Sequence, residues 1–193
     1  MITVALERNF DDPRSYIEKA NPDHPSLVDT RHRVADLYNI ENVPTALWID
    51  EDRNIVRPND VVFGSKPLKF FSGTSSDEHI SALKSWVRNE DESRDYLVSD
   101  DRRSEHQTLP SDDQLTARAE FHLAQWLYEQ DHRNKAQRHF EKACELAPED
   151  TAIQRGSMRM RNENPMGWAF IKMVIRRFWN GLSYYNPLPT KLK

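Results

Sequence analysis

The stretch VADLYNIENVPTALWID, Val34–Asp50, decides the fold of the first part of this chain. Its opening residues Val34, Leu37 and Tyr38 fall at helical spacing, which predicts a short amphipathic helix. A turn carrying Pro44 follows, and the apolar run after it predicts a buried strand. The order helix, proline turn and strand is the starting point for the rest of the chain.

Strand patterns lie on both sides of this stretch. Residues Ile2–Leu6 are apolar and partly β-branched, which predicts a buried strand, and Ser26–Val28 is a short strand candidate. Glu51–Asn54 is a polar turn, after which Ile55–Val56 resumes an extended pattern. The strand after Pro44 and this segment therefore predict a β-hairpin with a four-residue loop.

Helix signals separate these strands. Asp12 can cap a helix that Pro13 begins, and its inward face is expected to carry Tyr16, Ile17 and Ala20. The next helix is expected to be capped by Asp29 or Thr30.

A long loop is predicted from Arg57 to Ser76. Ser75 and Glu78 then have capping-box spacing at the start of a further helix. The apolar face of that helix is formed by Ile80, Leu83, Trp86 and Val87.

The second half begins with charge runs and continues as helices. Residues 91–111 lack an apolar period and predict a charged linker, with Tyr96, Leu97 and Val98 as an anchor. Ser111 and Gln114 again have capping-box spacing. The first predicted helix carries Leu115, Ala119, Phe121, Leu123, Ala124, Trp126 and Leu127; the second, after the turn Asp131–Asn134, carries Ala136, Phe140, Ala143 and Leu146 and ends at Pro148.

Composition restricts the function classes. The chain has 193 residues, 31 acidic against 27 basic side chains and a net charge of −4, which argues against a dedicated nucleic-acid binder. No window reaches the roughly 18 apolar residues of a membrane span, and the first residues lack a signal-peptide pattern, so we expect a cytoplasmic protein. The single cysteine, Cys144, cannot form an internal disulfide.

The residues after Thr151 are basic and rich in aromatic side chains. One interpretation is a helix that docks by its aromatic face; the other is contact with an anionic surface or nucleic acid.

No catalytic residue, metal site or cofactor is predicted. The spacing of His132, His139 and Cys144 fits no zinc pattern, and Cys144 is expected to be a buried, inert thiol. The acidic pairs suit caps and solvated runs, and neither a phosphate loop nor a nucleophile elbow is present in the sequence.

The proline turn, the apolar strand after it and the hairpin resemble the thioredoxin-like superfamily, particularly TlpA-like and ResA-like members, over residues 1–90. The resemblance implies a cis bond before Pro44. It also implies that Val43, Pro44 and Thr45 contact the backbone of a bound substrate or partner. The implied fold is a sheet flanked by helices.

The resemblance is incomplete because the redox C-x-x-C and the strand and helix that present it are missing. The absent strand would lie between Ile2–Leu6 and the strand after Pro44. The two remaining strands could close on one another, a partner could donate a strand, or the chain could be a fragment whose active site lies upstream of Met1. An unpaired edge also makes self-association plausible.

Residues 112–193 resemble a tetratricopeptide repeat followed by a basic aromatic tail. The positions that carry this resemblance are Leu123, Ala124, Ala136, Phe140, Ala143 and Pro148. Small alanines would let two antiparallel helices approach while Phe140 fills the space between them. A generic helical hairpin remains the alternative, and a helix from Thr151 could begin a partial second unit.

The overall expectation is an α/β protein: a partial thioredoxin-like domain (1–90), a charged linker (91–111) and a helical region (112–193). These expectations are compatible with two functions. In the first, the chain is a redox-inactive protein-interaction module that binds a protein partner, does not bind nucleic acid and does not span a membrane. Alternatively it is part of a thiol–disulfide oxidoreductase, in which case a periplasmic location is also open.

Overall fold

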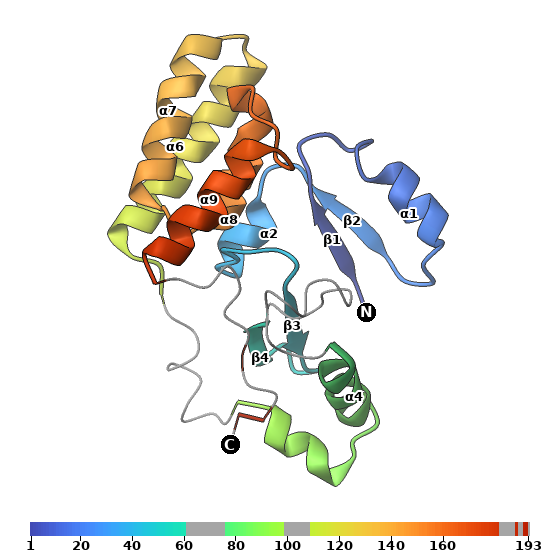
Figure 1. The fold of residues 1–193 in the computed structure, drawn as a ribbon. Coiled ribbons are helices and arrows are strands. Elements are labelled where there is room, and N and C mark those ends of the chain that lie inside the picture. The colour runs from blue at the N-terminus through green and yellow to red at the C-terminus, as the bar shows by residue number, and fades with distance from the viewer. Residues whose placement is uncertain (61–75, 99–108, 182–187, 189–190, 193) are drawn as a thin grey trace. The chain divides into compact units, whose positions relative to one another are not determined.

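The computed structural model describes residues 1–60, 76–98, 109–181, 188 and 191–192, and these residues form a mixed α/β structure (Figure 1). They contain seven α-helices and two separate sheets of two strands each. In chain order the elements are β1 (Thr3–Leu6), α1 (Arg14–Ala20), β2 (Ser26–Asp29), α2 (Arg33–Leu37), β3 (Ala46–Ile49), β4 (Ile55–Asp60), α4 (Ser76–Val87), α6 (Asp112–Glu129), α7 (Arg133–Leu146), α8 (Thr151–Met158) and α9 (Trp168–Trp179), with short 3-10 helices at Asp91–Tyr96 and Arg159–Arg161.

The chain folds into two compact units, each made of two separate stretches. Unit 1 contains Met1–Glu41 and Ser111–Glu163, and unit 2 contains Asn42–Pro110 and Asn164–Lys193. The sequence analysis divided the chain into consecutive segments, 1–90, 91–111 and 112–193, whereas each compact unit combines two stretches that are distant in sequence. The predicted domains remain a prediction.

In unit 1, β1 pairs with β2 in parallel, with Thr3 opposite Ser26 and Leu6 opposite Asp29. One expected arrangement was direct pairing of the first strand with the strand after Pro44. The described strands do not pair in this way, because β1 pairs with β2 and β3 pairs with β4. The strand expected to be buried is only half-buried, because Thr3 is exposed and Val4–Leu6 are intermediate.

Two predictions about helix α1 are wrong. Pro13, not Asp12, is the N-cap residue, and it makes no side-chain capping bond. No residue of α1 is buried, and Tyr16, expected to point inward, is 78% exposed. An apolar period marks one face of a helix, but a neighbouring element must be present to cover that face.

The start of α2 is held by Asp29, as one of the two expected alternatives. Its carboxylate accepts hydrogen bonds from the backbone N–H groups of Arg31, Arg33 and Val34 at 3.3, 3.0 and 2.7 Å. The bonds from Arg33 and Val34 satisfy donors that the first turn of a helix leaves without intrahelical partners. The N-cap residue itself is His32, in the left-handed region at φ 53°. Leu37, which the helical spacing places on the apolar face of this helix, is 80% exposed.

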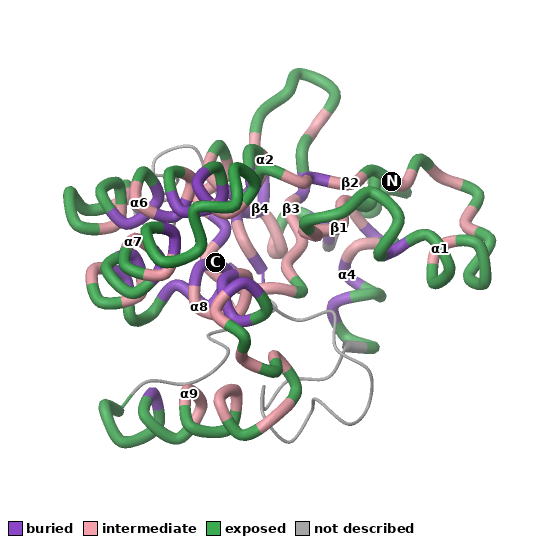
Figure 2. Tube along the Cα trace, turned by 90° about the horizontal axis from the view of Figure 1, so that it is seen from above, coloured by how far each residue is buried: buried purple, intermediate pink, exposed green. Residues whose placement is uncertain are grey.

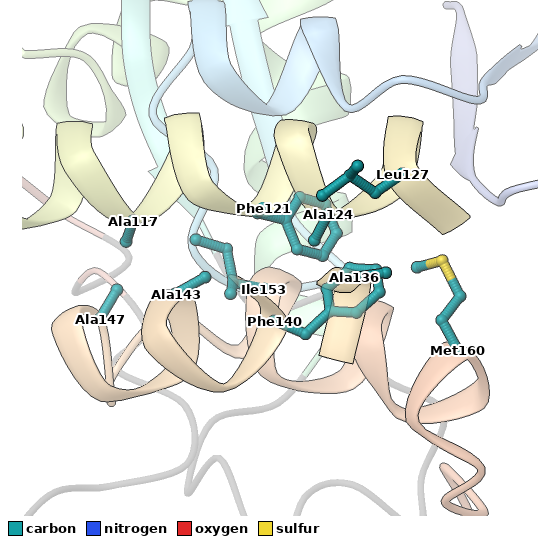
Figure 3. Close-up of a cluster of buried hydrophobic side chains, with 10 residues drawn as sticks. All are labelled: Ala117, Phe121, Ala124, Leu127, Ala136, Phe140, Ala143, Ala147, Ile153 and Met160. Carbon is teal, nitrogen blue, oxygen red and sulfur yellow. The ribbon is translucent and has the colours of Figure 1, made fainter. Parts of the chain in front are cut away.

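Helices α6, α7 and α8 contain the largest described core. The predicted capping box at Ser111 and Gln114 is confirmed, with both reciprocal hydrogen bonds. Phe121 and Phe140 meet edge to face, with ring centroids 5.8 Å apart. The cluster, drawn in Figure 3, comprises Ala117, Phe121, Ala124, Leu127, Ala136, Phe140, Ala143, Ala147, Ile153 and Met160.

The small residues of this core act as expected. Ala124, Ala136 and Ala143 have no exposed surface, so the two helices approach closely around the equally buried Phe140. Leu123 does not belong to the core, because it is 42% exposed. Figure 2 shows the purple, buried residues recurring along one side of α6 and of α7.

In unit 2, β3 and β4 form the predicted antiparallel hairpin, with an irregular register. Trp48 of β3 stacks on Trp86 of α4 at 5.2 Å between ring centroids. Val56 and Ala82 complete the buried cluster. Strand β4 continues to Asp60, so the loop predicted from Arg57 is wrong for its first four residues. Residues 61–75 of that prediction, including the predicted cap Ser75, lie outside the described residues.

The predicted anchor in the linker is confirmed. Tyr96 and Leu97 pack against the Trp48 cluster, and the backbone N–H of Val98 donates to the carbonyl of Val56 at 2.9 Å. The preceding charge run forms a 3-10 helix instead of an unstructured linker.

Candidate functional site

The structure brings the three predicted site residues together in one turn before β3. The Val43–Pro44 bond is cis, as the resemblance implied. Pro44 is exposed, whereas Val43 and Thr45 are half-buried. The Val43 N–H donates to the side-chain oxygen of Asn42 at 2.9 Å, which fixes the entry to the turn. The turn therefore presents one prolyl ring and two partly accessible neighbours.

The turn is tied to the far end of β4. The Thr45 hydroxyl donates to the backbone carbonyl of Asp60 at 3.5 Å, and the next residue, Ala46, is opposite Asp60 in the hairpin. Whatever holds Asp60 in place thus also fixes the position at which the turn enters β3.

Asp60 is the centre of a buried polar cluster that the sequence did not reveal. Its Oδ2 atom lies 2.8 Å from both Nε and a terminal nitrogen of Arg57, and 3.1 Å from His79 Nδ1 of α4. All three side chains are about as buried as the core, at 1% exposure each. We call Arg57, Asp60 and His79 the buried polar cluster.

Arg57 joins several elements through this cluster. It donates to the backbone carbonyl of Tyr96 at 2.9 Å, and its guanidinium carbon lies 5.4 Å from the centroid of the Trp48 ring. A guanidinium over an aromatic face is attracted to the ring as well as to the carboxylate. The cluster therefore connects β3, β4, α4 and the segment after Asp91 behind the turn.

Two polar atoms of the cluster have no hydrogen-bond partner in the part of the chain that the structure describes: Asp60 Oδ1 and His79 Nε2. Ion pairs this deeply buried are costly to desolvate and persist because both charges are present. The arrangement fixes the shape of the turn.

The only cysteine lies in the helical part of unit 1. Cys144 is half-buried on α7, and its thiol lies 3.5 Å from the Ser157 hydroxyl. Burial raises the pKa of Cys144, which disfavours the reactive thiolate. Among the described residues, no group of three or more His, Cys, Asp and Glu side chains is placed to hold a metal ion.

Unit 1 has its own polar contacts, between α6 and the segment that ends at Glu41. His122 Nε2 lies 2.6 Å from Asp36 Oδ2, and this hydrogen bond is the main reason why the pKa of His122 is raised. Arg118 donates to the Asn39 side chain. These pairs are more than 75 residues apart in sequence, so no local pattern could have identified them.

The start of α8 also contacts the segment that ends at Glu41. The backbone N–H groups of Thr151 and Ala152 donate to the carbonyl of Glu41 at 2.8 and 3.1 Å. Asp150 caps the helix, with its Oδ1 accepting from the N–H of Ile153 at 3.0 Å. Burial raises the pKa of Asp150 to about 7. This residue was not singled out from the sequence, and only its position before an expected helix at Thr151 could have indicated it.

No protein-family model, no curated protein and no solved structure matches this chain. None of the described helices combines the length and the apolar character needed to cross a bilayer.

Proposed function

We propose that the chain is a non-catalytic protein-interaction module. In this proposal unit 2 uses a thioredoxin-like proline turn to contact the backbone of a partner, and unit 1 contributes a tetratricopeptide-like helical hairpin. The observation that carries the proposal is a surface turn, Val43–Thr45, supported by the buried polar cluster in a chain with one cysteine.

Several contacts support this role. Exposed Pro44 and its half-buried neighbours provide a small apolar surface, while the hydrogen bonds to Asn42 and Asp60 hold the backbone in one conformation. A surface that is ordered before binding loses less conformational entropy when a partner docks. Dithiol exchange needs two thiols, whereas Cys144 is single and has a raised pKa.

The binding surface is tested with a displayed library of random peptides selected on the full chain. Peptides that bind the wild type should lose most of their enrichment on Val43→Glu, because the new charge lies within the surface. The matched control is Val87→Glu, which makes the same substitution at an exposed residue of α4, outside both the turn and the helical hairpin. Failure to select any peptide, or equal loss on the control, would reject the turn as the binding surface.

The absence of catalysis is tested separately. Insulin reduction with dithiothreitol should proceed at the same rate with and without the full chain, and with Cys144→Ser as the comparison. Turnover that disappears in Cys144→Ser would overturn the non-catalytic assignment, whatever the peptide selection gives.

A further inference from the structure

Helix α9 exposes a continuous apolar face. Five large side chains project from it, with exposed fractions of 64, 43, 40, 76 and 82% in chain order: Trp168, Ile171, Ile175, Phe178 and Trp179. Trp168, Ile171, Ile175 and Phe178 follow one another at three or four residues, and Trp179 is four residues after Ile175, so all five lie on one side of the helix. In Figure 2 most of α9 is accordingly drawn in green.

The opposite side of α9 is less exposed. Phe170, Met173 and Val174 are half-buried, and Arg177 is 8% exposed. A helix on the surface of a globular protein normally buries its apolar face and leaves polar residues in water. Here the more exposed side is the one that carries the large apolar residues, so this face is available to contact a second surface.

The charges around this apolar face indicate what kind of surface it would contact. Lys172 and Arg176 are exposed and lie along one edge of the apolar face. From Asn164 to Lys193 the sequence contains no aspartate or glutamate. Cations beside tryptophan and isoleucine are typical of helices in the interface of a bilayer, where the rings occupy the headgroup level.

Another exposed apolar stripe provides a contrast. On α6, Leu115, Leu123 and Trp126 are 51, 42 and 55% exposed, but the first turn of that helix carries Asp112 and Asp113. Anionic lipids would repel these carboxylates. The pattern of apolar residues with cations and without acids is thus specific to α9 among these two helices.

We propose that α9 is a peripheral anchor that lies in the interface of an anionic lipid bilayer. Its tryptophans and isoleucines insert to the depth of the headgroups, and Lys172 and Arg176 contact lipid phosphates. The inference is independent of the proposed function, because it uses no residue of the proline turn or of the buried polar cluster.

The test is flotation of the full chain with vesicles of phosphatidylcholine, with and without phosphatidylglycerol. The protein should float with the anionic vesicles, remain behind with the neutral ones, and dissociate as salt is added. Replacing Lys172 and Arg176 by Gln should weaken binding to anionic vesicles about 25-fold, since each cation near such a surface contributes about fivefold.

The apolar contribution is tested with the double variant Ile171→Ser, Ile175→Ser, which should weaken binding about tenfold or more. The matched control, Leu115→Ser with Leu123→Ser, alters two exposed leucines of α6 and should bind as the wild type does. Circular dichroism of each variant establishes that the helices persist.

Absence of flotation overturns the proposal, as does an equal loss in the α6 control. Tighter binding to a duplex oligonucleotide than to anionic vesicles, lost in the Lys172 and Arg176 variant, would assign the helix to nucleic acid instead.

Discussion

The raised pKa of Asp150 predicts that the stability of the protein falls as the pH rises from acid to neutral. Its side chain is 2% exposed, and burial is the largest cause that raises its pKa from 3.8 to about 7; the nearby charge of Glu41 acts in the same direction. The hydrogen bond from Ile153 N–H opposes this rise without cancelling it. A carboxyl with a raised pKa in the folded state binds a proton more tightly there than in the unfolded chain.

The sign and size follow from linkage. Between pH 3.8 and about 7 the folded state holds more protons than the unfolded state, so the free energy of unfolding falls as pH rises through this window. Below and above this window the contribution of Asp150 to the free energy of unfolding does not change with pH. At about 1.4 kcal/mol per pH unit, the difference of about three units amounts to at most about 4 kcal/mol.

The perturbation is Asp150→Asn, which keeps an oxygen that can cap α8 but cannot ionise. Relative to the wild type, the variant should gain stability steadily from pH 4 to pH 7, by up to about 4 kcal/mol, and gain nothing further above. The assay is urea unfolding followed by circular dichroism at each pH. Taking the difference between the two proteins removes the contribution of titrating groups that do not interact with Asp150.

Asp150→Ser is the matched control, because serine also caps helices and does not ionise. Its stability should differ from that of Asp150→Asn by an amount that does not change with pH. If the wild type and Asp150→Asn have parallel profiles from pH 4 to pH 8, the carboxyl titrates in the folded state as it does in water and the reasoning from burial is refuted.

Three further changes test the packing. Asp60→Ala leaves the buried Arg57 guanidinium without its carboxylate and should cost about 3–5 kcal/mol in urea unfolding, against a loss near zero if the pair contributes nothing. Gly156→Ala would place a Cβ 3.2 Å from His32 Cε1, so thermal unfolding should show a loss of about 1–2 kcal/mol after the gain in helix propensity; an increase in stability would contradict this contact. Ser111→Ala removes the capping box of α6 and should cost about 1 kcal/mol, while unchanged urea unfolding would mean that the cap is not needed.

The sequence was a good guide to local elements and a poor one to their surroundings. The helix, turn and hairpin around Pro44 and the capping box at Ser111 follow from short-range patterns, and the structure contains them. The apolar periods of α1 and α2 were also correct as helix signals, yet Tyr16 and Leu37 are exposed. Periodicity identifies a face, and only the packing of other elements decides whether that face is covered.

The candidate site divides in the same way. Val43, Pro44 and Thr45 could be identified from the turn they form. The cluster behind them could not, because His79 is 19 residues from Asp60 and is brought to it by the packing of α4 on the hairpin. The contacts of Asp36 with α6 and of Glu41 with α8 join even more distant parts of unit 1.

By itself the sequence determined most of the local elements, because local propensities set helices and turns, and it determined that an internal disulfide cannot form, because the chain has one cysteine. The tertiary structure alone decided where charge is buried: the ion pair of Arg57 and Asp60, and the carboxyl of Asp150 with a pKa near neutrality. The physical reason is that desolvation and pairing depend on neighbours in space, whereas hydrophobic period and capping depend on neighbours in the chain.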